Sequence, residues 1–157
     1  MLNRDFSDLL SAFADCGVEY LLIGAHALSV HGFVRATGDL DVWVRPSREN
    51  AGAVCKALRA FGAPAEMFTE DDLVQPDQVL QLGVAPVRID ILTSISGVTF
   101  DEAWGARMEV LVEGQSVSVL SREHLIINKQ ATGRPQDLID VDRLTQGDAG
   151  RGERGGE

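Results

Sequence analysis

Three aspartates in two short segments could support metal-dependent chemistry. Asp39 and Asp41 lie in one segment rich in strand-forming residues, and Asp90 lies in a second. Because side chains alternate along a β-strand, Asp39 and Asp41 project from the same face and lie side by side. If the two strands are neighbours in one sheet, Asp90 completes a cluster of three carboxylates.

Carboxylates held this close repel one another, which costs stability unless a cation compensates them. Mg²⁺, or Mn²⁺ in its place, suits this position, because it binds carboxylate oxygens and keeps sites open for substrate phosphates. The alternative for Asp39 and Asp41 is an exposed, solvated face. Asp90 favours the metal site, because its apolar neighbours indicate a central strand in which a bare carboxylate is costly. Arg88 shares the face of Asp90 and is expected to form a salt bridge with it, with a substrate contact as the alternative.

A glycine stands where the first predicted strand gives way to a helix. Gly24 follows the run Val18–Ile23 and precedes a short helical segment. A helix N-terminus presents unpaired N–H groups, and a glycine there lets a phosphate approach the backbone closely. Such a glycine is usually only a turn. The order of this turn, the paired acids and a third acid on a later strand favours the phosphate site.

These markers together resemble the nucleotidyltransferase superfamily, specifically the small bacterial proteins akin to the minimal nucleotidyltransferases and to the AbiEii toxins. The resemblance covers most of residues 20–144. Its motifs are Gly24-Ala25-His26-Ala27 with His31-Gly32, Arg35-Ala36-Thr37-Gly38-Asp39-Leu40-Asp41, Ile89-Asp90-Ile91, Leu125-Ile126-Ile127-Asn128-Lys129 and Gly133-Arg134-Pro135-Gln136-Asp137-Leu138. The spacing from the turn to the first acid is longer than in the minimal nucleotidyltransferases and points to the AbiEii-like branch.

The resemblance implies roles for the three acids. In the family the paired acids hold Mg²⁺, which assigns Asp39 and Asp41 to the metal. The third acid helps to activate the attacking group, which assigns that role to Asp90 and places it in the same metal site. In-line attack on an α-phosphorus needs positioning and charge neutralisation more than covalent help, and this suits such a set of residues.

The resemblance also implies nucleotide contacts. Gly24 and Ala25 would hold the triphosphate, and Lys129 would neutralise part of its charge. Many family members have Gly or Ser where this chain has Ala25, so the backbone N–H is the only polar contact left there. Arg35 and Thr37 have the same parity as Asp39. In an extended segment they either line the same groove and touch phosphate or ribose, or lie on the surface.

Other polar residues are expected to have structural roles. His26 and His31 are five residues apart on a short helix, a spacing that does not align two metal ligands. Cys16 and Cys55 match neither a CxxC pair nor a zinc pattern, and we interpret both as reduced, small hydrophobic residues.

The last predicted helix begins with a polar segment. Asp137, Asp140 and Asp142 are expected to be first-turn and surface charges, with Arg134 paired to one of them. A phosphate contact of Arg134 is the alternative.

Composition limits the class of protein. The 157 residues carry a formal charge of −10, and 45% are hydrophobic, as in one soluble globular domain. The chain has no apolar run long enough to span a membrane and no signal-peptide pattern, so we expect a cytoplasmic protein. The acidic charge opposes passive binding to nucleic acid but allows RNA as a substrate at a local basic patch.

The elements predict one α/β (α+β) domain over residues 1–146, followed by a disordered tail at 147–157. Its mixed, twisted sheet should carry the acids, with helices packed mainly on one side. Strands are predicted at 18–23, 39–44, 79–82, 87–92, 108–112 and 116–120. Helices are predicted at 4–16, 25–30, 48–61, 99–104, 122–131 and 135–144, with a helical turn at 70–73.

Two functions follow. The first is a Mg²⁺-dependent nucleotidyltransferase that moves an NMP group from an NTP to a hydroxyl acceptor on RNA, such as tRNA, or on protein. The second is a non-catalytic or weakly active regulatory module of the same fold, such as a toxin–antitoxin component with a protein partner. Retention of all three acids favours the enzyme, whereas Ala25 favours the module.

Overall fold

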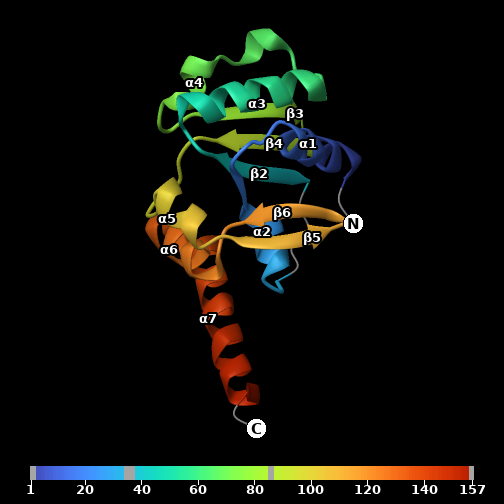
Figure 1. The fold of residues 1–157 in the computed structure, drawn as a ribbon. Coiled ribbons are helices and arrows are strands. Elements are labelled where there is room, and N and C mark those ends of the chain that lie inside the picture. Colours follow the sequence, from blue (N-terminus) through green and yellow to red (C-terminus); the bar gives the residue numbers. More distant parts are fainter. Residues whose placement is uncertain (1–2, 34–37, 85–86, 156–157) are drawn as a thin grey trace.

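A mixed six-stranded β-sheet organises the chain, with strand order β3-β4-β2-β1-β6-β5 (Figure 1). The computed structural model describes residues 3–33, 38–84 and 87–155, without the side chains of 65, 84 and 147–155. The strands are β1 (Tyr20–Ile23), β2 (Asp39–Val44), β3 (Val79–Val84), β4 (Val87–Leu92), β5 (Met108–Val112) and β6 (Gln115–Val119). β1 is antiparallel to β2 and parallel to β6, while β4 is parallel to β2 and antiparallel to β3. This confirms the predicted mixed sheet.

Apart from the end of the last helix, the helices begin and end near the residues that the sequence predicts. They are α1 (Arg4–Asp15), α2 (Gly24–Val30), α3 (Arg48–Phe61), α4 (Glu70–Val74), α5 (Phe100–Gly105), α6 (Arg122–Thr132) and α7 (Pro135–Gly155), with a 3₁₀ turn at Ala65–Met67. The Ser47 side chain accepts a hydrogen bond from the Asn50 N–H at the start of α3, and Gly62 ends that helix in the left-handed conformation. Thr99 and Glu102 form a capping box on α5. These local contacts explain why the element boundaries could be predicted.

Alternation along β2 gives the sheet one apolar face and one face that carries the acids. Val42 is buried on the apolar face, where α1 packs with Phe13 against Tyr20 at 5.3 Å between ring centroids. α3 packs beside α1. On the acid face, α5 covers Trp43 with Phe100, whose ring lies 5.0 Å away. The part of the acid face nearer the start of β2 carries Asp39 and Asp41.

α7 is the element that differs most from its predicted boundary. It continues through Gly155, past the predicted end at Leu144, and extends away from the sheet (Figure 1). Leu144 is fully buried. The disordered tail at 147–157 stays a prediction. Within the described ranges, no helix is long and apolar enough to cross a membrane.

Candidate active site

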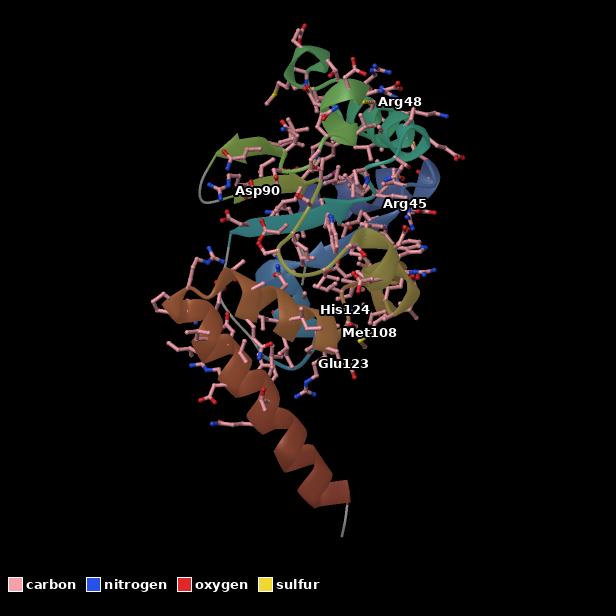
Figure 2. The ribbon with its side chains drawn as sticks, turned by 90° about the vertical axis from the view of Figure 1, so that its left-hand side faces the viewer. Arg45, Arg48, Asp90, Met108, Glu123 and His124 are labelled. Carbon is pink, nitrogen blue, oxygen red and sulfur yellow. The ribbon has the colours of Figure 1, made fainter. Side chains whose placement is uncertain are left out.

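The pairing of β2 with β4 brings the three aspartates together. The two strands are parallel, and their register places Asp41 beside Asp90 and Asp39 beside Arg88. Residues paired in this way share a face of the sheet, so all four side chains project from the same side. Figure 2 shows Asp90 on this part of the sheet. The predicted neighbour relation between the two acid-bearing strands is confirmed.

Gly24 lies directly against one of these acids. Ile23 at the end of β1 pairs with Asp41, and Gly24 follows with a φ of +68°. A Cβ atom at Gly24 would lie 2.4 Å from the Oδ2 atom of Asp41, which is closer than van der Waals contact allows. The position therefore requires glycine for two reasons, its positive φ and the approach of the Asp41 carboxylate.

Asp41 is strongly perturbed by its surroundings. Burial raises its pKa from 3.8 to about 6, and the negative charges of Asp90 and Asp39 and a hydrogen bond with Asp90 act in the same direction. The charge of Arg88 opposes the rise without cancelling it. The ionised form of Asp41 is thus electrostatically unfavourable in the folded protein.

Arg88 bridges the other two acids. Its Nε atom donates to Asp90 Oδ1 at 3.0 Å, and its Nη2 atom donates to Asp90 Oδ2 at 3.2 Å and to Asp39 Oδ2 at 3.3 Å. The salt bridge predicted between Arg88 and Asp90 is confirmed. Its extension to Asp39 was not predicted, because it depends on the pairing of β2 with β4.

The donor set fits a hard divalent cation by its chemistry. Asp39, Asp41 and Asp90 supply only carboxylate oxygens, which Mg²⁺ and Mn²⁺ prefer. Nevertheless, no group of three or more His, Cys, Asp and Glu side chains in the described part of the chain is arranged to hold a metal ion. Arg88 is bound to two of the three acids instead.

The other predicted nucleotide contacts are placed as follows. Ala25 lies in the first turn of α2, and its carbonyl accepts a hydrogen bond from the Ser29 hydroxyl at 3.1 Å. Arg35 and Thr37 lie outside the described residues, so their predicted contacts stay predictions.

Lys129 lies in a buried charge cluster between α6 and α7. The side chain is 9% exposed, and its Nζ atom donates to Asp140 at 2.8 Å and lies 3.7 Å from Asp137. Burial opposes the ionisation of Asp137, but hydrogen bonds from Arg134 and Thr132 outweigh it and hold the pKa at about 2. The triphosphate role of Lys129 stays a prediction.

Asp137 lies in the first turn of α7 as predicted, but the prediction that Asp137 and Asp140 are surface charges is wrong, because the packing of α7 against α6 buries both. Asp142 is exposed as predicted, and the predicted pairing of Arg134 is confirmed by its 2.6 Å contact with Asp137. The spacing could have revealed the burial: 137, 140 and 144 form one helical stripe, and Leu144 is apolar.

The contacts of His26 and His31 and the free thiols of Cys16 and Cys55 are consistent with the structural roles that we expected. The buried His31 lies with Nε2 2.9 Å from the carbonyl oxygen of Leu120. His26 packs edge-on against Phe6, and burial lowers its pKa. Cys16 and Cys55 are both free thiols.

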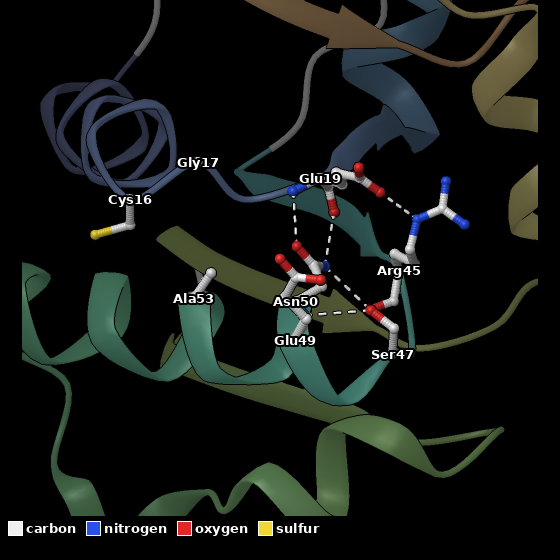
Figure 3. A pocket seen from close by; sticks show the side chains of 8 residues that line it. All are labelled: Cys16, Gly17, Glu19, Arg45, Ser47, Glu49, Asn50 and Ala53. Carbon is white, nitrogen blue, oxygen red and sulfur yellow. Dashed lines mark hydrogen bonds and ion pairs between the residues drawn. The ribbon is translucent and has the colours of Figure 1, made fainter.

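A cavity of about 420 Å³ lies between the end of α1 and the start of α3 (Figure 3). Its lining includes Asn50, whose amide accepts from the Glu19 N–H at 2.8 Å and donates to the carbonyls of Glu19 and Arg45 at 3.0 Å. Asn50 thus ties α3 to the strand ends. Its lining includes none of Asp39, Asp41 and Asp90, and Figure 2 shows Arg45 apart from Asp90, so this cavity is separate from the three aspartates.

Comparison with known proteins identifies the family of the chain. A family model described as a nucleotidyltransferase of unknown function (DUF6036) matches residues 5–145. No curated protein matches the chain.

Three solved structures have a similar fold. ANT(2'')-Ia in complex with adenylyl-2''-tobramycin is 16% identical, with a TM-score of 0.60 over 94% of this chain and 89% of that chain. The lincosamide antibiotic adenylyltransferase LnuA, lincomycin-bound, is 16% identical, with a TM-score of 0.59 over 92% and 97%. A candidate nucleotidyltransferase of Thermotoga maritima is 15% identical, with a TM-score of 0.55 over 98% and 92%. At these identities the likeness shows the fold alone.

Proposed function

The chain belongs to the DUF6036 family of nucleotidyltransferases, and we propose that it moves a nucleoside monophosphate from an NTP to a hydroxyl group. The proposed acceptor is an RNA, such as tRNA, or a protein. The observation that carries the proposal is the register of β2 and β4, which sets Asp41 beside Asp90 while Asp41 also touches the Gly24 turn. A nucleotide at this turn would have its phosphates beside the acids.

Each of the proposed site residues has its own role in the transfer reaction. The acceptor oxygen forms a bond to the α-phosphorus, the bond to the leaving oxygen breaks, and pyrophosphate departs. Asp90 accepts the proton of the acceptor hydroxyl, and the turn at Gly24 and Ala25 positions the triphosphate through backbone N–H groups. Asp39, Asp41 and Asp90 would hold Mg²⁺ or Mn²⁺, and this ion, when bound, would neutralise the charge that develops on the phosphates.

The second candidate is a regulatory module without turnover, such as a component of a toxin–antitoxin pair. Arg88 favours it, because its guanidinium already compensates Asp39 and Asp90 without a metal. Ala25 favours it as well, because its methyl group offers phosphate no hydrogen bond. In the module, nucleotide or a protein partner would bind without transfer.

Transfer of label decides between the two candidates. The purified protein is incubated with each α-labelled NTP, Mg²⁺ or Mn²⁺ and total RNA or lysate, and the labelled product identifies the acceptor. Lincomycin and tobramycin are added as small-molecule hydroxyl acceptors, since the related folds include enzymes bound to lincomycin and to an adenylylated tobramycin. We expect label on RNA or protein, and none with Asp90→Asn. A wild-type protein that binds a protein partner but labels nothing would favour the module.

A further inference from the structure

Arg88 binds two of the three carboxylates that the proposed reaction needs as metal ligands. Its guanidinium contacts Asp39 and Asp90 from between β2 and β4, and both are proposed metal ligands. We infer that Arg88 is a built-in cation that holds these two acids in the metal-free protein and must leave before a divalent ion can bind them. The inference rests on the proposed function, because it concerns the same metal site.

The contacts show that the two cations compete for the same oxygen atoms. Arg88 binds both oxygens of Asp90 and Oδ2 of Asp39. All three oxygens accept hydrogen bonds from the guanidinium, and while these contacts are closed no group of three acids among the described residues is arranged to hold a metal ion. Binding of the ion therefore requires the Arg88 contacts to open.

The surroundings of Arg88 allow it to leave. Its side chain is 35% exposed and that of Asp39 is 38% exposed, so the bridge can open towards solvent. On the side away from Asp39, the residue paired with Arg88 is Gly83 of β3. Gly83 has no side chain, so the guanidinium can swing over β3 without meeting a side chain at that position. The Asp90 side chain, by contrast, is only 12% exposed, so it is less free to move than Arg88.

Of the two residues that flank Arg88 in the sheet, Asp39 binds its guanidinium, and Gly83 has no side chain to hold it. Arg88 thus lowers the repulsion among the acids when no ion is present. It also lowers the apparent affinity for the ion, which is proportional to the fraction of molecules in which the bridge is open. If the bridge is closed in about nine molecules in ten, the apparent affinity falls about tenfold.

Binding of Mn²⁺ without nucleotide tests the inference directly. Free Mn²⁺ is measured by electron paramagnetic resonance above the pKa of Asp41, for wild type, Arg88→Gln and Arg88→Lys. Arg48→Gln is the matched control, because it removes the same charge from a surface ion pair with Asp71. We expect Mn²⁺ to bind about tenfold more tightly to Arg88→Gln and equally well to the control. Arg88→Lys should show an intermediate gain, because lysine keeps the charge but cannot make the paired hydrogen bonds of the guanidinium.

A second measurement uses the wild-type protein, so it does not depend on the folding of a variant. The Nε–Hε signal of Arg88 is followed by ¹⁵N NMR during titration with Mg²⁺, and the signal missing from Arg88→Lys identifies it. We expect the signal to shift as the ion displaces the guanidinium. An unmoved signal at metal saturation would overturn the inference.

The possible failures are distinguishable. If the metal binds wild type and Arg88→Gln equally well, the competition is refuted while the proposed metal site stands. If neither protein binds metal, with or without a non-hydrolysable NTP, the metal site of the proposed function fails and the competition fails with it.

Discussion

Replacing Asp41 with asparagine should make the metal-free protein more stable while it abolishes transfer. Asparagine keeps the size and shape of the side chain and removes its charge. The negative charge of Asp41 is unfavourable in the folded protein, because burial and the charges of Asp90 and Asp39 raise its pKa to about 6. The same charge is needed to bind a cation.

The magnitude follows from the pKa. A rise from 3.8 to about 6 corresponds to about 3 kcal/mol, at about 1.36 kcal/mol for each tenfold change in proton affinity. Because Asp41 is only partly buried, solvent screening reduces this upper value. We expect Asp41→Asn to gain about 1 to 2 kcal/mol in the free energy of unfolding near neutral pH.

The gain should depend on pH with a defined sign. Between 3.8 and about 6 the folded protein keeps a proton on Asp41 that the unfolded chain has released. The contribution of Asp41 to the free energy of unfolding therefore falls as the pH rises through this window, and the variant lacks this contribution. The difference should be small below the lower value and constant above the upper one.

Urea unfolding across this pH range, without metal, measures the difference. Asp8→Asn is the control, because Asp8 is exposed on α1 and away from the cluster. Transfer by Asp41→Asn should fall about 100-fold or more, as loss of several kcal/mol of charge stabilisation requires. A variant less stable than wild type at neutral pH, or one with full transfer activity, would refute the reasoning.

Three further results are expected. Gly24→Ala should lose more stability than Gly17→Ala in thermal unfolding: both glycines have a φ of +68°, which costs about 1 to 2 kcal/mol for alanine, but only Gly24 faces the Asp41 carboxylate. Lys129→Met should cost about 3 to 5 kcal/mol, because it removes the buried cation that binds Asp140 and lies near Asp137, and the added change Asp140→Asn should restore part of the loss in urea unfolding. Saturation with the correct NTP and Mg²⁺ at about 100 times the dissociation constant should raise stability by about 2.7 kcal/mol, measured as a shift in Tm.

Each of these results has an outcome that contradicts it. Equal losses for the two glycine variants would mean that Asp41 moves aside at no cost. A stable Lys129→Met protein with weakened NTP binding would place Lys129 in the nucleotide site, as the family resemblance implies. A Tm that no NTP raises in the presence of Mg²⁺ would count against nucleotide binding.

The sequence by itself determined the local elements and the identity of the acids. Ser47 and Gly62 bound a helix through contacts within a few residues, and the alternation of Asp39 and Asp41 places them on one face wherever their strand lies. Gly24 could be identified as a turn for a similar reason. Such features depend on neighbours along the chain, so the amino-acid order is enough to predict them.

Only the tertiary structure decided which distant charges meet. Asp41 and Asp90 are adjacent because β2 and β4 pair in one particular register, and a shift by one residue would have turned the acids to opposite faces. The same register brings Arg88 to Asp39, and the packing of α7 on α6 buries Lys129 with Asp140. Strand register and helix packing are set by the burial of the whole core and not by local spacing. For that reason the sequence could name the acids, but it could not show that an arginine already holds two of them.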